Sequence, residues 1–108
     1  MSAQELDSDI KRKIIEILHV CFPIAHVYLY GSRAKKTNTS RSDIDLAIDA
    51  GAPVDRYLLG EARSLLDALY MPYKVDLVDL NAVSKNFREI VLREGILWSQ
   101  PMSDLKNH

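Results

Sequence analysis

Two aspartates near the middle of the chain could hold a divalent metal ion. Asp43 and Asp45 lie in the segment 42–49, in which polar and apolar residues alternate. That alternation predicts a half-covered β-strand, on which side chains two residues apart project from the same face. Two carboxylates held so close repel each other unless a cation lies between them or one of them is protonated. Oxygen ligands on a rigid strand suit Mg²⁺ or Mn²⁺, which also accept phosphate oxygens and water.

A third carboxylate is available on a later predicted strand, over residues 73–80. Asp76 and Asp79 both lie in this segment, and either could complete the group. Three acidic side chains can hold two divalent ions, which is the arrangement used for in-line displacement at phosphorus. The acidic residues therefore indicate phosphoryl or nucleotidyl transfer with two metal ions.

A phosphate-binding turn is predicted upstream of the aspartates. Gly31 follows a predicted strand and allows close approach of the backbone to a ligand, while Ser32 offers a hydroxyl group and could open a short helix. Between Ser32 and Asp43 the chain has no acidic residue and four basic ones, Arg33, Lys35, Lys36 and Arg41. A basic loop beside carboxylates suits a metal-bound triphosphate. Arg33 and Lys35 lie nearest the phosphate site, and we expect Arg33 to contact the nucleotide.

Hydrophobic periodicity predicts the elements that position these residues. Helices are expected over 4–21 and 54–70 and between Ser84 and Gly95, and strands over 25–30, 42–49, 73–80 and 96–98. Two consecutive strands indicate an antiparallel pair, and the following strand–helix–strand unit indicates a parallel neighbour. The predicted fold class is α/β (α+β), with a small mixed sheet, helices packed on one face, and the face with the aspartates left open.

Composition limits the classes to which the protein can belong. The chain has 108 residues, of which 47% are hydrophobic and 27% charged, as expected of one soluble domain over residues 1–100 with a polar tail over 101–108. A net charge of -1 argues against a nucleic-acid partner. The apolar runs are too short for a membrane helix, and the polar N-terminus predicts a cytoplasmic protein without a signal peptide. The single cysteine, Cys21, excludes an internal disulfide and a Cys-based zinc site.

The motifs together resemble those of a known family. Gly31-Ser32, ten residues and then Asp43-Ile44-Asp45 is similar to the signature of the DNA polymerase β-like nucleotidyltransferases. More narrowly, about three quarters of the chain resembles the minimal nucleotidyltransferases (MNT) that are paired with HEPN proteins. The resemblance implies that Gly31 and Ser32 bind the nucleotide phosphates and that Asp43 and Asp45 bind metal.

Two further positions follow from the same resemblance. The third carboxylate of the family lies between apolar residues, which Asp76 matches best, whereas Asp79 has the opposite strand parity and is the second choice. One departure is Lys36, where many relatives carry glycine, and it bears on the path of the loop backbone. It leaves the predicted metal site intact.

The resemblance also implies an activity and a partner. It predicts a nucleotidyltransferase that uses two Mg²⁺ (or Mn²⁺) ions and moves AMP from ATP to a tyrosine of a HEPN ribonuclease toxin, as the antitoxin of a toxin–antitoxin pair. The alternative is a non-catalytic antitoxin that neutralises a helical partner by binding it. A chain of this size has no second domain to cover the nucleotide, so a heteromeric complex with the HEPN protein, or a homodimer, would complete the site.

Overall fold

Helices and strands alternate along the part of the chain that the structure describes. The structure is a computed structural model and describes residues 8–37, 39 and 42–101. In chain order the elements are α1 (Ser8–Cys21), β1 (His26–Tyr30), α2 (Ser32–Lys35), β2 (Ile44–Asp49), α3 (Arg56–Asp67), β3 (Val75–Asp79), α4 (Lys85–Glu94) and β4 (Ile96–Ser99). The predicted elements are therefore present, including the short helix after Gly31. None of the described helices is both long and apolar enough to span a membrane.

Both ends of the sequence prediction fall outside the described residues. Positions 4–7 of the first predicted helix are not described, and neither are positions 102–108 of the predicted tail. Pro101, the first residue of that tail, is buried.

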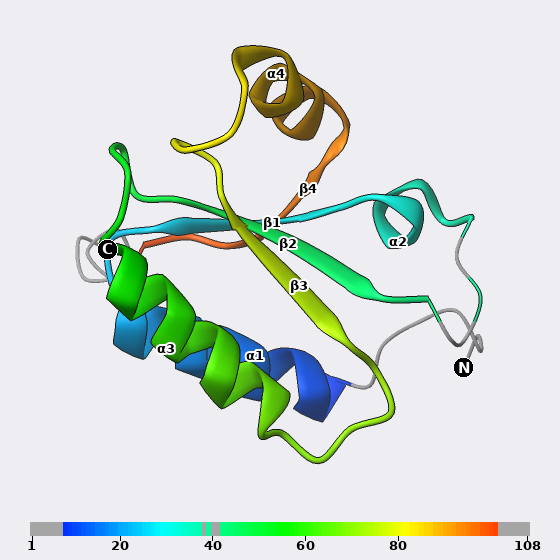
Figure 1. Cartoon of the computed structure of the whole chain (residues 1–108). Helices are drawn as coiled ribbons and strands as arrows, with labels where there is room; N and C mark the ends of the chain where they lie inside the picture. The colour runs from blue at the N-terminus through cyan, green and yellow to red at the C-terminus, as the bar shows by residue number, and fades with distance from the viewer. Residues whose placement is uncertain (1–7, 38, 40–41, 102–108) are drawn as a thin grey trace, which may run out of the picture.

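The four strands form one mixed sheet in the order β3-β2-β1-β4. β1 pairs antiparallel with β2 and β4, whereas β2 and β3 run parallel. The predicted antiparallel pair, parallel neighbour and α/β (α+β) class are thereby confirmed. Figure 1 shows α1 and α3 side by side on one face of the sheet and α4 on the other.

The main core lies between the sheet and the layer formed by α1 and α3. Ile44, Leu46 and Ile48 of β2 are 0% exposed, and so are Ile14 and Leu18 of α1. Burial of one such side chain contributes roughly 1.5–3 kcal/mol to folding. The alternating apolar residues of β2 thus hold the strand against the core, and its aspartates lie on the opposite face.

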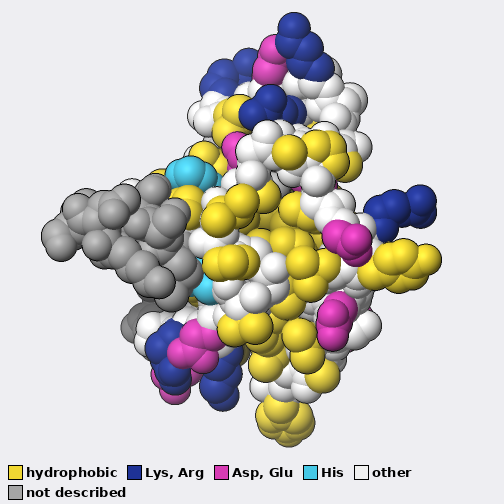
Figure 2. Space-filling view, turned by 90° about the vertical axis from the view of Figure 1, so that its left-hand side faces the viewer, with side chains coloured by type: hydrophobic (Ala, Val, Ile, Leu, Met, Phe, Trp, Pro, Cys, Tyr) yellow, Lys and Arg dark blue, Asp and Glu magenta, His cyan; other side chains and the backbone are white. Residues whose placement is uncertain are grey.

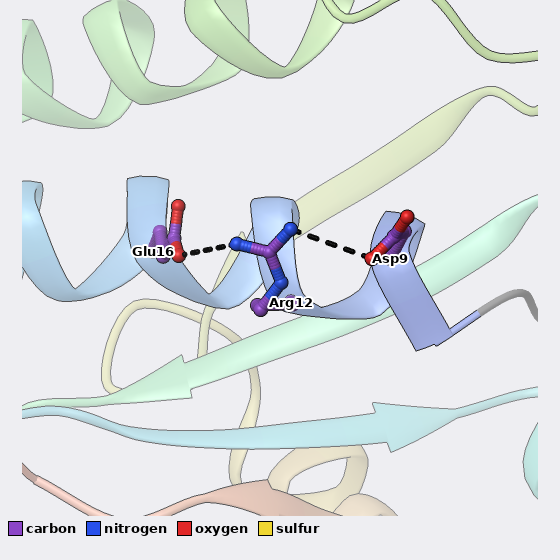
Figure 3. Close-up of polar contacts among 3 residues, drawn as sticks. All are labelled: Asp9, Arg12 and Glu16. Carbon is purple, nitrogen blue, oxygen red and sulfur yellow. Dashed lines mark hydrogen bonds and ion pairs between the residues drawn. The ribbon is translucent and has the colours of Figure 1, made fainter.

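The outer face of α1 carries charged residues that pair with one another. Arg12 Nη1 lies 3.0 Å from Glu16 Oε1, and Arg12 Nη2 lies 3.4 Å from Asp9 Oδ1 (Figure 3). Residues three and four positions apart are neighbours on a helix surface. Burial of Ile14 and Leu18 turns the apolar face of α1 to the sheet, and these exposed pairs lie on its solvent face.

The prediction that all helices pack on one face and leave the aspartate face open is wrong, because α4 packs on part of that face. Ala47 and Leu80 are 0% exposed and form a second core cluster with Val91 of α4. Tyr30 and Phe87 extend this cluster, with ring centroids 5.4 Å apart in an edge-to-face arrangement. The sequence signal for the packing of α4 on this face is Ala47, the apolar residue among the aspartates of β2.

α4 begins and ends at the predicted residues. The Ser84 hydroxyl accepts a hydrogen bond of 3.1 Å from the backbone N–H of Phe87. At the other end the backbone N–H of Gly95 donates to the carbonyl of Val91 at 2.7 Å. A Cβ atom at Gly95 would lie 2.5 Å from that carbonyl oxygen and 3.1 Å from the carbonyl oxygen of Leu29. Gly95 therefore lets α4 approach β1 closely.

We predict that Gly95→Ala destabilises the protein by about 1–3 kcal/mol, because the added methyl group has no space beside two backbone oxygens. Gly60→Ala is the matched control, since Gly60 lies in α3 with nothing within 4 Å of an added Cβ. We expect that control to gain about 0.5–1 kcal/mol from helix propensity. Urea unfolding of the two variants measures both effects, and a Gly95→Ala variant as stable as the wild type would contradict the close contact.

Candidate active site

Three carboxylates share the face of the sheet opposite the main core. Asp45 on β2 lies in register with Asp76 on the parallel strand β3, and Asp43 precedes Asp45 by two residues. Neighbouring strands are about 4.8 Å apart, so the side chains of an in-register pair are close neighbours. Asp45 is half-buried, whereas Asp43 and Asp76 are exposed. The structure thus brings together three of the predicted site residues.

The electrostatics of Asp45 reflect this crowding. Burial raises the pKa of the Asp45 carboxyl, and the negative charges of Asp76 and Asp43 raise it further, while the positive charge of Arg33 lowers it. Within residues 8–37, 39 and 42–101, however, no three His, Cys, Asp or Glu side chains form a ready group for metal binding. The charges of these carboxylates therefore repel one another, but their oxygens do not converge on a single metal-binding position.

The structure separates Asp76 from the other candidate on β3. Asp79 is 4% exposed, and its carboxylate accepts hydrogen bonds from the backbone N–H groups of Val54 at 2.8 Å and Asn81 at 3.0 Å. The side chain of Asp79 thus lies on the face of β3 opposite to that of Asp76, as its strand parity predicted. Its two oxygens bind the backbone of the loops that contain Val54 and Asn81. Asp49, at the end of β2, accepts a hydrogen bond from the backbone N–H of Gly51 at 2.9 Å and so caps the turn that follows the strand.

The predicted phosphate-binding turn lies directly against Asp45. Gly31 has a φ of 75°, which L side chains rarely adopt, and a Cβ atom there would lie 2.5 Å from Oδ2 of Asp45. Ser32 follows as the first residue of α2. Only glycine fits this position, and its lack of a side chain lets the backbone of the turn pack directly beside the Asp45 carboxylate.

The basic residues of the loop occupy different environments. Arg33 is 6% exposed and donates two hydrogen bonds to the carbonyl of Ser42, from Nε at 3.2 Å and from Nη2 at 2.8 Å. Lys35 is exposed, with its Nζ 4.0 Å from Oε1 of Glu94. Lys36 has a φ of 60° and a ψ of 31°, the left-handed conformation that glycine adopts most easily. The contact of Arg33 with a nucleotide stays a prediction.

An aromatic residue, Tyr30, borders the site. Tyr30 lies opposite Asp45 on β1 and packs its ring against Phe87. Burial, followed by the charges of Asp45 and Asp76, raises the pKa of the Tyr30 hydroxyl to about 12, so Tyr30 stays protonated at neutral pH. A hollow of about 110 Å³ lies between Tyr30, Gly31 and α4.

One contact of the site was missed by sequence reasoning. The guanidinium of Arg33 lies over the ring of Tyr73, with its Cζ 4.8 Å from the ring centroid. Tyr73 lies forty residues from Arg33 and precedes β3, so neither periodicity nor a local motif marks the pair. Only the aromatic character of Tyr73 offered a signal.

Comparison with known protein families gives one match that spans most of the chain. Residues 12–100 match the family described as polymerase beta, nucleotidyltransferase. The chain is 35% identical over 75 residues to the probable protein adenylyltransferase MntA of Haemophilus influenzae, covering 69% of this chain and 66% of that protein. It is 35% identical over 97 residues to the protein adenylyltransferase MntA of Shewanella oneidensis, covering 87% and 68% respectively. The chain thus spans about two thirds of the length of these relatives.

Solved structures with similar folds come from toxin–antitoxin complexes. A chain from a toxin–antitoxin structure with AMP-PNP superposes with a TM-score of 0.71 at 30% identity, covering 90% of this chain and 78% of that one. A chain from the tri-AMPylated Shewanella oneidensis HEPN toxin in complex with MNT antitoxin gives a TM-score of 0.67 at 28% identity, covering 94% and 79%.

The raised pKa of Asp45 gives a prediction about stability. A carboxyl group whose pKa is raised on folding binds its proton more tightly in the folded chain, so its deprotonation lowers stability as the pH rises from the unfolded pKa through the folded one. We therefore expect Asp45→Asn to raise the unfolding temperature by a few degrees at about pH 7, where the wild-type carboxylate is charged. Below the ordinary pKa of 3.8 both states of the wild type are protonated, and the gain should vanish.

Thermal unfolding of both proteins at about pH 7 and about pH 3 measures this difference. Asp67→Asn, a change at an exposed aspartate of α3, controls for the loss of one negative charge. A lower unfolding temperature of Asp45→Asn at about pH 7 would contradict the electrostatic repulsion.

Proposed function

Because the chain belongs to the polymerase beta nucleotidyltransferase family, we propose that it transfers AMP from ATP to a hydroxyl group of a partner protein. One observation carries the proposal: the Gly31 turn lies against Asp45, which in turn lies in register with Asp76. A phosphate-binding turn and the carboxylates are thus contiguous on an exposed face. This arrangement is what transfer of a metal-bound nucleotide requires.

The chemistry of the donor set fits a divalent metal. Asp43, Asp45 and Asp76 supply only oxygen ligands. Burial raises the pKa of Asp45, and the charges of Asp76 and Asp43 raise it further; a bound cation would relieve that repulsion. We propose that these three residues hold Mg²⁺, or Mn²⁺ in its place, as two ions. When bound, such ions lower the pKa of an acceptor hydroxyl and neutralise charge on the phosphates.

The residues of the chain itself would bind and orient the reactants. In this proposal Gly31 and Ser32 hold the phosphates, and the exposed Lys35 adds positive charge beside them. Asp76 is exposed on the edge strand β3, where an acceptor hydroxyl can approach it and give up its proton. The acceptor oxygen then bonds to the α-phosphorus as the bond to pyrophosphate breaks.

The acceptor is proposed from the relatives. Two relatives are named protein adenylyltransferases, and one solved complex holds an AMPylated HEPN toxin beside its MNT antitoxin. By analogy, the acceptor would be a tyrosine of a HEPN-type toxin, and the chain would act as the antitoxin in the cytoplasm, where ATP is available.

Exposed apolar side chains provide surface that a protein partner would cover. Figure 2 shows hydrophobic side chains gathered in the middle of the face at the end of α1 and the start of α3. Val20 near the end of α1 is 81% exposed, Ile24 in the connection from α1 to β1 is 60% exposed, and Tyr57 at the start of α3 is 90% exposed. Apolar patches of this kind are common at sites of protein–protein contact.

A second candidate function is neutralisation of the toxin by binding alone. The observation in its favour is that the described Asp, Glu, His and Cys side chains form no ready group of three metal ligands. In that case the carboxylates would be dispensable, and only the interaction surface would matter.

Intact-mass spectrometry of the chain mixed with its HEPN partner, ATP and Mg²⁺ tests the choice. We predict that the partner gains the mass of one or more AMP units and that Asp43→Asn/Asp45→Asn reduces the rate by at least about 1,000-fold, because the metal ligands are lost. Asp49→Asn is the matched control, since it removes a carboxylate from the same strand face but leaves the three candidate ligands in place.

Each outcome decides between the two candidates. AMP transfer by the wild type and by Asp49→Asn, but not by the double variant, would support the enzyme. A stable complex without any mass gain, in which the double variant neutralises the toxin as well as the wild type, would support the binding module instead.

A further inference from the structure

Arg33 differs from the other basic residues of its loop because it is buried. In the described part of the chain the buried charged residues are Arg33 and Asp79, and Arg33 is 6% exposed. Removing a guanidinium from water is costly unless hydrogen bonds and ring contacts replace the lost solvation. The surroundings of Arg33 must therefore supply such contacts.

The planar guanidinium uses two kinds of contact at once. Its Nε and Nη2 atoms both donate to the carbonyl of Ser42, at 3.2 and 2.8 Å, and its Cζ lies over the ring of Tyr73, 4.8 Å from the ring centroid. Lysine cannot reproduce this pair of contacts, because its single ammonium group has no fixed fork of N–H donors.

These contacts join the three segments that carry the proposed site residues. Arg33 directly follows Ser32, Ser42 directly precedes Asp43, and Tyr73 lies three residues before Asp76. A backbone hydrogen bond of 2.8 Å from Ile44 to Lys74 ties the starts of β2 and β3 together at the same level. Movement of Arg33 would consequently affect the phosphate turn and both metal-binding strands.

We infer that Arg33 is a positioning residue, which fixes the relative placement of Ser32, Asp43 and Asp76 through Ser42 and Tyr73 and does not itself contact the nucleotide. The inference rests on the proposed function, because it takes the three carboxylates to be metal ligands. It assigns Arg33 a different role from the nucleotide contact predicted from the sequence. The burial of Arg33 and its two-point bond to a backbone carbonyl favour the positioning role.

The test is Mn²⁺ affinity, measured on the full chain without nucleotide from the electron paramagnetic resonance signal of the free ion. Arg33→Lys removes the two-point contact, and Tyr73→Leu removes the ring while keeping an apolar side chain. Loss of groups that orient metal ligands typically weakens metal binding about 10–100-fold. We expect both variants to bind Mn²⁺ at least about 10-fold more weakly than the wild type.

Two matched controls separate positioning from general loss of contacts. Arg63 makes the same two-point contact elsewhere, with Nε and Nη2 donating to the carbonyl of Leu77 at 3.1 and 2.8 Å, but it is exposed and its partner lies in the edge strand β3. Tyr73→Phe keeps the ring and removes the hydroxyl group. We expect Arg63→Lys and Tyr73→Phe to bind Mn²⁺ within about twofold of the wild type.

Circular dichroism of each variant establishes that it is folded, and Tyr73→Leu decides the question if Arg33→Lys does not fold. Unchanged Mn²⁺ affinity in the folded variants would overturn the inference. A raised KM for ATP with unchanged Mn²⁺ affinity would also overturn it, since that result indicates direct nucleotide contact. If the wild type bound Mn²⁺ no better than Asp43→Asn/Asp45→Asn, the proposed metal site itself would fail, and the inference with it.

Discussion

The parallel register between β2 and β3 holds two like charges side by side, and much of the structure serves to maintain that placement. Asp45 and Asp76 are partners in the register, and a slip by one residue would turn the side chains of β2 to the opposite face. Such a slip is opposed by Ile44, Leu46 and Ile48, which are 0% exposed on the core side. The main core thus fixes an arrangement of carboxylates that their own repulsion disfavours.

The backbone before β2 has a conformation that allows it to lie close to Asp45. Gly31 has a positive φ and leaves no space for a side chain beside Asp45. Lys36 ends α2 in a left-handed conformation although it is not a glycine. Two unusual backbone conformations therefore flank a four-residue helix, which brings Ser32 and Arg33 next to the start of β2. Such conformations are maintained when the surrounding structure over-determines them.

Much of the fold and part of the candidate site could be predicted from local patterns. Alternation over 42–49 predicted both the strand and the common face of Asp43 and Asp45. The residues alone left Asp76 and Asp79 as alternatives, and the family resemblance favoured Asp76. The position of α4 on the aspartate face could not be predicted, because one alanine, Ala47, was its signal. The contact of Arg33 with Tyr73 also required the tertiary structure, since it joins segments forty residues apart.

The place of β3 at the edge of the sheet has a consequence for how acceptors are selected. Under the proposed function, an incoming hydroxyl group would approach Asp76 from the exposed edge of the sheet. Selection of the acceptor would then depend on how the whole acceptor docks, at a distance from the reacting atoms. Recognition and chemistry would consequently be carried by different residues. In that case, substitutions on the docking surface would change the target while leaving the carboxylates and the glycine turn untouched.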